Sequence, residues 1–343
     1  MSDRDRPRPP VTAAEAGTAL VTVSAIRSAA EQLSGVTIRT PLVPYGSLGS
    51  GLWLKAESLQ PIGAFKLRGA YVAIASLPHE ARRRGVITYS SGNHAQGVAR
   101  AARMLGVPAV VVMPSDAPSI KRVRVAADGA EIVIVGTASD ERQARAEEIA
   151  ATRDMSIIPP FDDDRIIAGQ GTVGLEIAED LPDVALILVP VGGGGLAAGL
   201  AAAVKALRPA ARIIGVEPEL AADARESLAR GEIVRWSAAD VSRTIADGTR
   251  TQSLGHRTFA HLRAHLDGIV TVSEAEIVAG VRLAAERSRL VVEPSGALAV
   301  AAMAFRATEL GLADIHGPVV GVVSGGNVDP DDYRRYLGTP LPD

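Results

Sequence analysis

The sequence predicts an α/β protein with two open, mostly parallel, twisted sheets that carry helices on both faces. Short β-branched runs alternate with longer stretches of helical periodicity along most of the 343 residues, a pattern typical of parallel strands joined by helices. Hydrophobic residues make up 47% of the chain, which is enough for a sizeable core. We find no solenoid repeat and no coiled-coil heptads.

The expected strands are short apolar runs bounded by turn residues. They are Leu52–Lys55, Val86–Tyr89, Ala109–Val112, Glu131–Val135, Leu186–Val189, Arg212–Val216, Ile269–Val272 and Val319–Val323. The expected helices lie between them. They are Phe65–Leu77, Gly92–Leu105, Ser119–Ala127, Asp140–Thr152, Gly171–Asp180, Leu196–Leu207, Ala275–Ser288 and Gly296–Leu310.

Three polar stretches receive structural interpretations. His261 and His265 lie four residues apart, but Leu262 stands where a zinc protease needs Glu, so we expect a solvated helix face. Asp162–Asp164 is expected to form a polar loop, and Lys121–Arg124 an exposed basic helix face.

The chain is expected to fold as a small domain inserted into a larger one. Residues 85–160 form a compact run of strand–helix units, and residues 18–84 with 161–343 would make the large domain. Residues 1–17 are rich in Arg, Asp and Pro and predict a mobile tail. Val184–Val204 is uncharged, but a proline and four glycines interrupt it, so we expect no membrane association and a cytoplasmic location.

Charge and composition exclude several classes of function. The 36 basic and 39 acidic residues give a net charge of −3, which argues against a chain that coats nucleic acid or anionic membrane. The absence of cysteine excludes disulfides, thiolate catalysis and cysteine-ligated metal sites. Because guanidinium does not deprotonate at usable pH, amine chemistry is confined to the lysines. There are four, Lys55, Lys66, Lys121 and Lys205.

A glycine-rich turn follows the expected strand Leu186–Val189. Its four consecutive glycines, Gly192–Gly195, open a helix, so free N–H groups and the helix dipole predict an anion site. Gly192, Gly194 and Ala197 also fit the dinucleotide pattern G-x-G-x-x-[GA], with Glu217 where a ribose-binding acid is expected. An NAD-dependent dehydrogenase is therefore one alternative.

Two further turns and one lysine favour a different cofactor. Ser90–His94 and Ser324–Asn327 also follow expected strands. Together with the glycine-rich turn they make three polar strand ends, whereas a dinucleotide needs only the first such turn. Lys66 lies at the expected start of a helix, whose positive N-terminal potential favours the neutral amine. An amine, an anion cradle, and hydroxyl or amide groups around a flat ring are what pyridoxal 5'-phosphate requires.

Taken together, these motifs resemble the fold-type II pyridoxal-phosphate enzymes of the threonine/serine dehydratase and serine racemase branch. The matching stretches, in the family's order, are Gly63–Ala70, Ser90–Gly97, Ala168–Thr172, Gly192–Leu196, Ile245–Gly248, Glu293–Ala297 and Ser324–Asp329.

The resemblance implies a role for each matching residue. Lys66 would form the internal aldimine and later remove the Cα proton of the substrate. The other residues that would hold the cofactor are Phe65 and Gly248 on the two ring faces, Asn93 at the phenolic oxygen, Gly192, Gly193, Gly194, Gly195 and Leu196 at the phosphate, and Ser324 at the pyridine nitrogen. Ser90, Asn93 and His94 would hold the substrate carboxylate.

The implied reaction is α,β-elimination from L-threonine or L-serine, giving a 2-oxo acid and ammonia. Ser91 stands where serine racemases have a second proton-transfer group, so racemisation is an alternative, as is dehydration of 3-hydroxyaspartate or of a hydroxyectoine-pathway substrate. Glu217, Ala221 and Asp223 match a racemase-like cation site for Mg²⁺ or Ca²⁺, all with hard oxygen ligands. The family also implies a homodimer whose only other partner is a small amino acid substrate.

Overall fold

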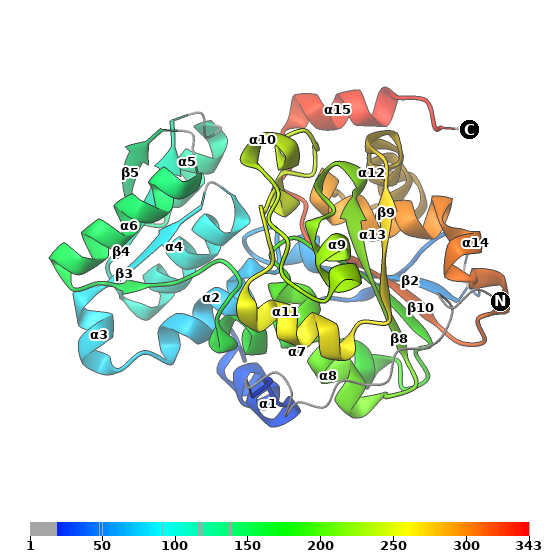
Figure 1. Cartoon of the computed structure of the whole chain (residues 1–343), viewed down its shortest axis with the longest axis horizontal. Helices are drawn as coiled ribbons and strands as arrows, with labels where there is room; N and C mark the ends of the chain where they lie inside the picture. The colour runs from blue at the N-terminus through cyan, green and yellow to red at the C-terminus, as the bar shows by residue number, and fades with distance from the viewer. Residues whose placement is uncertain are drawn as a thin grey trace.

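A computed structural model describes residues 19–342 except positions 48, 50, 91, 116, 118, 137 and 138, and at positions 119, 120, 139 and 140 it describes the backbone alone. It contains two sheets surrounded by helices (Figure 1). The six-stranded sheet has the order β1-β2-β10-β7-β8-β9 and the four-stranded sheet the order β5-β4-β3-β6. Only β1 and β2 pair antiparallel, and the other neighbours pair in parallel. The predicted fold class is confirmed.

The six-stranded sheet takes its strands from both ends of the chain. They are β1 (Leu42–Pro44), β2 (Leu52–Ala56), β7 (Leu186–Pro190), β8 (Arg212–Pro218), β9 (Gly268–Val272) and β10 (Val319–Val323). The helices outside the range of the smaller sheet are α1 (Val23–Gln32), α2 (Lys66–Ala75), α7 (Asp164–Asp180), α8 (Gly195–Leu207), α9 (Asp223–Arg230), α10 (Ala238–Val241), α11 (His256–His265), α12 (Glu274–Ser288), α13 (Pro294–Phe305), α14 (Ala307–Leu310) and α15 (Pro330–Gly338). Single 3₁₀ turns are η2 (Glu57–Leu59), η3 (Glu219–Ala221), η4 (Asp247–Thr249) and η5 (Leu312–Asp314).

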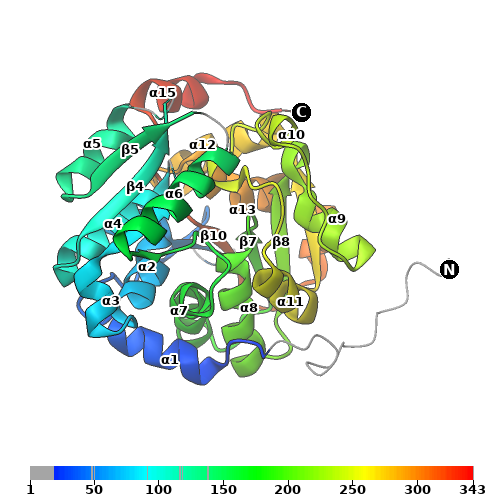
Figure 2. The ribbon, with the colours of Figure 1, turned by 60° about the vertical axis from the view of Figure 1, so that its left-hand side comes forward.

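The four-stranded sheet forms a separate layer on one side of the molecule (Figures 1 and 2). Its strands are β3 (Val86–Tyr89), β4 (Ala109–Pro114), β5 (Glu131–Val135) and β6 (Ser156–Ile157), and its helices are α3 (His79–Arg84), α4 (Asn93–Leu105), α5 (Ser119–Ala127) and α6 (Ser139–Arg153). These strands all fall within residues 85–160. The predicted domain boundaries themselves remain a prediction.

The central strands of the large sheet are buried on both faces. In β7, Ile187 and Val189 pack into the cluster formed with α1, α7 and α8, whereas Leu186 and Leu188 pack into the cluster formed with α12 and α13. Because side chains alternate along a strand, a strand covered on both faces is apolar at every position. This burial explains why the central strands were visible in the sequence as continuous hydrophobic runs.

Several helix boundaries differ from the prediction. The helix expected from Gly171 begins earlier, at Asp164, because the side chain of Asp163 caps it by accepting from the backbone N–H of Arg165 at 2.8 Å. Asp164 therefore belongs to a helix rather than to the predicted polar loop. The helix expected to reach Leu310 breaks after Phe305 and resumes as α14.

The predicted solvated face at His261 is wrong. His261 is fully buried, its Nδ1 lies 2.7 Å from the carbonyl oxygen of Arg257, and its Nε2 accepts from the backbone N–H of Val21 at 2.8 Å. Burial lowers the pKa of this imidazole, so the neutral ring serves as an anchor between α11 and the segment before α1. The periodicity of α11 alone gave no indication of that partner.

The basic face predicted at Lys121–Arg124 is only partly exposed. Lys121 forms an ion pair with Asp247, and the side chain of Lys121 is 12% exposed. The exposed face was predicted from the run of basic residues alone, which gives no indication of the ion pair between Lys121 and Asp247 of η4.

The uncharged stretch Val184–Val204 forms β7 and most of α8, and no helix in the described part of the chain is long and apolar enough to cross a membrane. Here α7 and α8 pack through glycine. A Cβ on Gly199 would lie 2.1 Å from the carbonyl oxygen of Ile167 and 2.5 Å from the backbone nitrogen of Gly171. The two helices therefore approach each other more closely than any side chain at Gly199 allows.

Gly199→Ala is expected to lower the free energy of unfolding by about 1–3 kcal/mol. The added Cβ overpacks the contact between α7 and α8, and the cost of this overpacking exceeds the ~1 kcal/mol that a helix gains when alanine replaces glycine. The measurement is thermal unfolding followed by circular dichroism. Gly338→Ala is the matched control, because a Cβ at that helical position meets nothing within 4 Å. Equal stability of Gly199→Ala and wild type would contradict the packing argument.

Candidate active site

The turns after β3 and β10 meet beside the start of α2. The side-chain amide of Asn327 donates to Oδ1 of Asn93 at 2.8 Å, and the backbone N–H of Phe65 donates to the carbonyl oxygen of Ser324 at 3.1 Å. A bridge between Ala64 and Gly325 fixes the same contact. Three of the sequence-predicted segments therefore lie together, although they are far apart in the chain.

Lys66 is the first residue of α2, and its amine points toward a backbone carbonyl. Nζ donates to the carbonyl oxygen of Pro160 at 2.7 Å and lies 5.2 Å from the ring centroid of Phe65. Burial lowers the pKa of Lys66 from 10.5 to about 8. The lowered pKa of Lys66 was expected to come from the helix N-terminus, whereas desolvation of the amine is the cause in the structure. The neutral amine is therefore more populated near neutral pH than in an exposed lysine, at about a tenth of the molecules at pH 7.

The other three lysines are each paired with a carboxylate. Lys55 contacts Glu176 at 2.6 Å, Lys205 contacts Asp267 at 2.8 Å, and Lys121 pairs with Asp247. Among the lysines, all of which the structure describes, Lys66 alone has a carbonyl partner instead of a carboxylate. Lys66 is therefore the lysine best suited to act as a nucleophile.

The four glycines after β7 form a tight turn into α8. Gly194 is the N-cap residue with φ of 90°, and it has no side chain to occupy the N–H groups of the first turn. A Cβ on Gly193 would lie 2.2 Å from the ring of Phe161, and one on Gly194 would lie 2.9 Å from Cβ of Thr258. Glycine is therefore required here, and the turn presents backbone donors at a helix N-terminus, which suits an anion.

Phe161 and Thr258 were missed by the sequence analysis. Thr258 donates from Oγ1 to the carbonyl oxygen of Gly193 at 2.8 Å and accepts from the backbone N–H of Gly255 at 3.0 Å. Asp162, next to Phe161, accepts from three N–H groups at the start of α11. Phe161 and Thr258 hold the glycine turn from outside, and neither lies in a pattern that the sequence marks as functional.

Gly248 and Ser324 are joined through Ser295. Oγ of Ser295 accepts from the backbone N–H of Gly248 at 2.8 Å, and Oγ of Ser324 lies 3.4 Å from the carbonyl oxygen of Ser295. A Cβ on Gly192 would lie 3.3 Å from the carbonyl oxygen of Gly248. The predicted ring-face glycine, the pyridine-facing serine and the glycine turn are thus brought together.

The turn after β3 contributes Ser90, Asn93 and His94. Nε2 of His94 lies 3.0 Å from the carbonyl oxygen of Ile158, while its buried Nδ1 has no hydrogen-bond partner among the described residues. Burial, followed by the charge of Lys66, lowers the pKa of His94 to about 3, so the imidazole is neutral. Oγ of Ser90 accepts from the N–H of Gly92 at 3.3 Å. Ser91 lies outside the described residues.

Glu293 is a buried carboxyl group in the same region, and the sequence analysis gave it no role. It is 3% exposed, and its Oε1 accepts from Nδ2 of Asn93 at 2.6 Å. Burial, and then the charge of Asp247, raise the pKa of Glu293 to about 7. Two signals were available in the sequence, namely the matching stretch Glu293–Ala297 and the position of a glutamate before the apolar helix Pro294–Phe305.

A second acidic pair lies after β8. Glu217 is fully buried and accepts from the N–H groups of Ala224 at 3.0 Å and Arg225 at 2.7 Å. Asp223 is also fully buried, and neither of its carboxyl oxygens has a hydrogen-bond partner in the part of the chain that the structure describes. Burial raises the pKa of Asp223 to about 7, and burial together with Asp223 raises that of Glu217. In the described part of the chain, no group of three or more His, Cys, Asp or Glu side chains forms a metal cluster.

Comparison with known proteins identifies the family. The model of the family described as "Pyridoxal-phosphate dependent enzyme" matches residues 33–325. The chain belongs to this family. The match includes Lys66 and the glycine turn, so the dinucleotide interpretation of that turn is withdrawn, and pyridoxal phosphate is the cofactor.

Several curated proteins and solved structures are similar to this pyridoxal-phosphate-dependent enzyme over most of its chain. The L-threo-3-hydroxyaspartate ammonia-lyase of Saccharomyces cerevisiae is 42% identical over 291 residues, which is 84% of this chain and 87% of the relative. The L-threonine ammonia-lyase of Thermotoga maritima is 41% identical over 328 residues, 94% of this chain and 79% of the relative. The structure of maize serine racemase matches with a TM-score of 0.87 and 34% identity, covering 93% of this chain and 97% of that one.

The residues of this pyridoxal-phosphate-dependent enzyme fit its cofactor. A Cβ on any of Gly192, Gly193, Gly194 or Gly195 would meet a neighbour at 3.0 Å or less, so the turn is a cradle that only glycine leaves open. The amine of Lys66 has a lowered pKa and no carboxylate partner. An aldehyde and a phosphate are the two groups that these features would engage.

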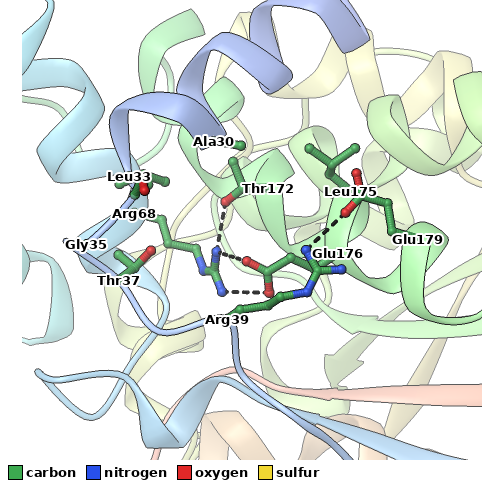
Figure 3. Close-up of a pocket in the computed structure, with 11 residues that line it drawn as sticks. Ala30, Leu33, Gly35, Thr37, Arg39, Arg68, Thr172, Leu175, Glu176 and Glu179 are labelled. Atoms are coloured by element: carbon green, nitrogen blue, oxygen red, sulfur yellow. Dashed lines mark hydrogen bonds and ion pairs between the residues drawn. The ribbon is translucent and has the colours of Figure 1, made fainter.

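In this pyridoxal-phosphate-dependent enzyme, a buried ion network anchors α2, the helix that carries Lys66. Arg68 is 1% exposed and donates to Glu57 at 2.8 Å and to Glu176 at 2.6 Å. Thr172 accepts from Arg68 at 3.0 Å, and Lys55 binds Glu176. Figure 3 shows Arg68 and Glu176 pointing toward one another beside a pocket of about 340 Å³ that also includes Arg39.

Thr258→Val is expected to weaken cofactor binding about tenfold, because the carbonyl of Gly193 loses its hydroxyl donor and the phosphate turn loses a support. The measurement is titration of the apoprotein with pyridoxal 5'-phosphate, followed by visible absorbance. Thr271→Val is the matched control, because Oγ1 of Thr271 accepts from the exposed side chain of Arg225 at 3.2 Å, away from the glycine turn. Equal affinities for the two variants would exclude the supporting role of Thr258.

Proposed function

We propose that this pyridoxal-phosphate-dependent enzyme is an ammonia-lyase that converts L-threonine or L-serine to a 2-oxo acid and ammonia by α,β-elimination. The carrying observation is the amine of Lys66, which has a pKa of about 8 and donates to the carbonyl oxygen of Pro160 instead of pairing with a carboxylate. The similarity to an L-threonine ammonia-lyase and an L-threo-3-hydroxyaspartate ammonia-lyase supports the reaction class.

Lys66 carries the proton transfer in this proposal. When bound, pyridoxal phosphate supplies an electron sink that acidifies the Cα–H bond of the substrate. Nζ of Lys66 removes that proton in its neutral form, which desolvation favours at neutral pH. The β-hydroxyl leaves with a proton as water, and the released enamine then takes up one water to give the 2-oxo acid and ammonia.

The groups around Lys66 orient the reactants. Ser324 would face the pyridine nitrogen with a hydroxyl rather than a carboxylate, which suits a milder electron sink. Gly192–Leu196 would bind the phosphate, Phe65 and Gly248 would cover the ring faces, and Asn93 would donate to the phenolic oxygen. Ser90 and the backbone N–H groups of Asn93 and His94, which open α4 and have no intrahelical acceptor, would hold the substrate carboxylate.

Substrate and stereochemistry define the alternatives within the same family. The similarity to maize serine racemase supports a role for Ser91 as a proton donor on the opposite face of Cα, which would give a D-amino acid. A 3-hydroxyaspartate or a hydroxyectoine-pathway dehydratase would use the same residues on a different substrate.

We also infer a homodimer in the cytoplasm, with an inserted small domain of residues 85–160. Seven large apolar side chains are exposed in the described part of the chain, among them Ile38, Leu59 and Val291 at 47%, 46% and 51%. A second copy of the chain is the partner that we infer. The lack of cysteine is consistent with a reducing compartment.

Lys66→Ala is expected to abolish both the visible absorbance of the bound cofactor and the formation of 2-oxo acid from L-threonine and L-serine. Lys205→Ala is the control, because Lys205 pairs with Asp267 outside the site. Parallel assays with 3-hydroxyaspartate, and chiral analysis of L-serine reactions with wild type and Ser91→Ala, separate the alternatives. Retained turnover in Lys66→Ala would remove Lys66 from the scheme.

We further propose that Glu217, the carbonyl of Ala221 and Asp223 bind Mg²⁺ or Ca²⁺. Two fully buried carboxylates, one of them with both oxygens unpartnered, support this proposal, since an uncompensated buried charge is costly. Hard oxygen ligands of this kind are those that both ions prefer. The ion would neutralise the pair and fix the segment before α9.

Mg²⁺ is expected to raise the melting temperature more at pH 8 than at pH 6. The pKa of Asp223 rises from 3.8 to about 7 on folding without a cation, so stability falls as pH rises through that window, and the cation, which competes with the proton, offsets the loss. Thermal unfolding with Mg²⁺ or a chelator measures the effect. Asp223→Asn should abolish it, whereas Glu219→Gln, a neighbouring exposed carboxylate, should not. A Mg²⁺ effect that is independent of pH would contradict this site.

A further inference from the structure

Four side chains form one continuous hydrogen-bond relay between α5 and α13. Arg124 donates from Nη1 to Oδ1 of Asn327 at 2.5 Å. Nδ2 of Asn327 donates to Oδ1 of Asn93 at 2.8 Å, and Nδ2 of Asn93 donates to Oε1 of Glu293 at 2.6 Å. Every bond in the relay runs in the same direction, from a cation toward a carboxyl group.

The two ends of the relay determine how the two amides are oriented. A guanidinium has no acceptor, so Asn327 must present its oxygen to Arg124 and its nitrogen to Asn93. The carbonyl oxygen of Ile62, which accepts from Nδ2 of Asn327 at 2.8 Å, requires the same orientation. Asn93 therefore turns its oxygen toward Asn327 and its nitrogen toward Glu293.

An amide nitrogen carries two N–H groups, and Glu293 uses one of those on Asn93. The second is left for another acceptor. If the amide of Asn93 were flipped, its oxygen would take that place and would repel an acceptor instead of binding it. The orientation of this amide therefore decides whether Asn93 is a donor or an acceptor toward the cofactor.

Glu293 is buried without a cation of its own. The charged groups that act on it are Asp247, which opposes its ionisation, and Lys121, which favours it, and these two are paired with each other. A buried carboxyl group without a facing cation destabilises a fold. An apolar side chain would pack at this position with less cost to stability, so the presence of a carboxyl group indicates a use for its acceptor oxygen.

The backbone leaves room for this carboxyl group. A Cβ on Gly325 would lie 2.2 Å from Oε1 of Glu293, and the N–H of Glu293 donates to the carbonyl oxygen of Gly325 at 3.1 Å. Gly325 thus leaves free the space that the carboxyl group of Glu293 occupies.

We propose that Glu293 is a positioning residue that, together with Arg124 at the far end of the relay, fixes the amide of Asn93 so that its second N–H faces the phenolic oxygen of the cofactor. This inference rests on the proposed role of Asn93. It assigns a function to a buried carboxyl group that touches neither the substrate nor the reacting atoms.

The test uses the full-length protein, loaded with pyridoxal 5'-phosphate or stripped of it, in four variants. Glu293→Ala removes the acceptor, and Glu293→Gln replaces it by an amide oxygen that can still accept. Arg124→Ala breaks the exposed end of the relay without disturbing the buried end. Arg122→Ala, on the same helix, is the matched control. The readouts are the dissociation constant of the cofactor, the position of its visible absorbance band and the melting temperature of the apoprotein.

Glu293→Ala is expected to raise the dissociation constant about tenfold and to shift the absorbance band. Arg124→Ala should shift the band in the same direction with a smaller loss of affinity, and this result is decisive if Glu293→Ala fails to fold. Glu293→Gln should recover most of the affinity and the wild-type band, and Arg122→Ala should match wild type.

Two results would overturn the inference. One is an unchanged band and affinity in both Glu293→Ala and Arg124→Ala while wild type binds the cofactor. The other is a Glu293→Gln variant that folds but binds as poorly as Glu293→Ala, because that would assign the effect to charge rather than to orientation. A wild-type protein that binds the cofactor and turns over no β-hydroxy amino acid would refute the proposed function instead and leave the Glu293 readouts intact.

Discussion

Two buried cations, Arg68 and Lys55, are balanced inside the molecule by Glu57 and Glu176, and the position of α2 depends on that balance. Both nitrogen ends of the Arg68 guanidinium are engaged, and the pKa of Glu57 is lowered by Arg68 despite its burial. Removal of one member of such a network leaves an uncompensated charge and costs about 3–5 kcal/mol. Since Arg68 is only two residues beyond Lys66, the network that fixes the helix also fixes the amine.

Glycine contacts complete the placement of α2. A Cβ on Gly97 of α4 would lie 3.1 Å from the carbonyl oxygen of Lys66, and one on Gly169 of α7 would lie 2.6 Å from Cα of Gly69. The helix is thus held between an element of the four-stranded sheet and an element of the six-stranded one. Close backbone packing limits the movement of α2. Ion pairs and glycine contacts therefore act on the same ten residues from different sides.

The sequence predicted those features whose cause is local or periodic. Central strands such as Leu186–Pro190 are apolar on both faces and so are visible as runs, and the glycine turn after that strand follows from backbone geometry alone. Lys66 could be predicted because lysine is scarce and its motif is specific. Short strands such as β1 and β6, with three and two residues, are below the length at which periodicity is informative.

Features that depend on distant partners could not be predicted. The burial of His261 depends on Val21, 240 positions away in the chain, and the role of Thr258 depends on the glycine turn that it touches. Glu293 belongs to a motif, but its environment is set by Asn93, Gly325 and Asp247, which come from three other segments. No window of sequence contains these neighbours, so the charge and burial of such a group can be known only from the fold.

The pairing of lysines has a consequence for chemical selectivity. Pyridoxal phosphate is an aldehyde that condenses with any accessible unprotonated primary amine. In this chain, Lys55, Lys121 and Lys205 are each held by a carboxylate, and the other basic side chains are arginines and histidines, which do not form stable imines under these conditions. Side reactions of the aldehyde with the protein's own surface are therefore suppressed, and a free aldehyde is directed to Lys66 by the scarcity of competing amines as well as by the shape of the site.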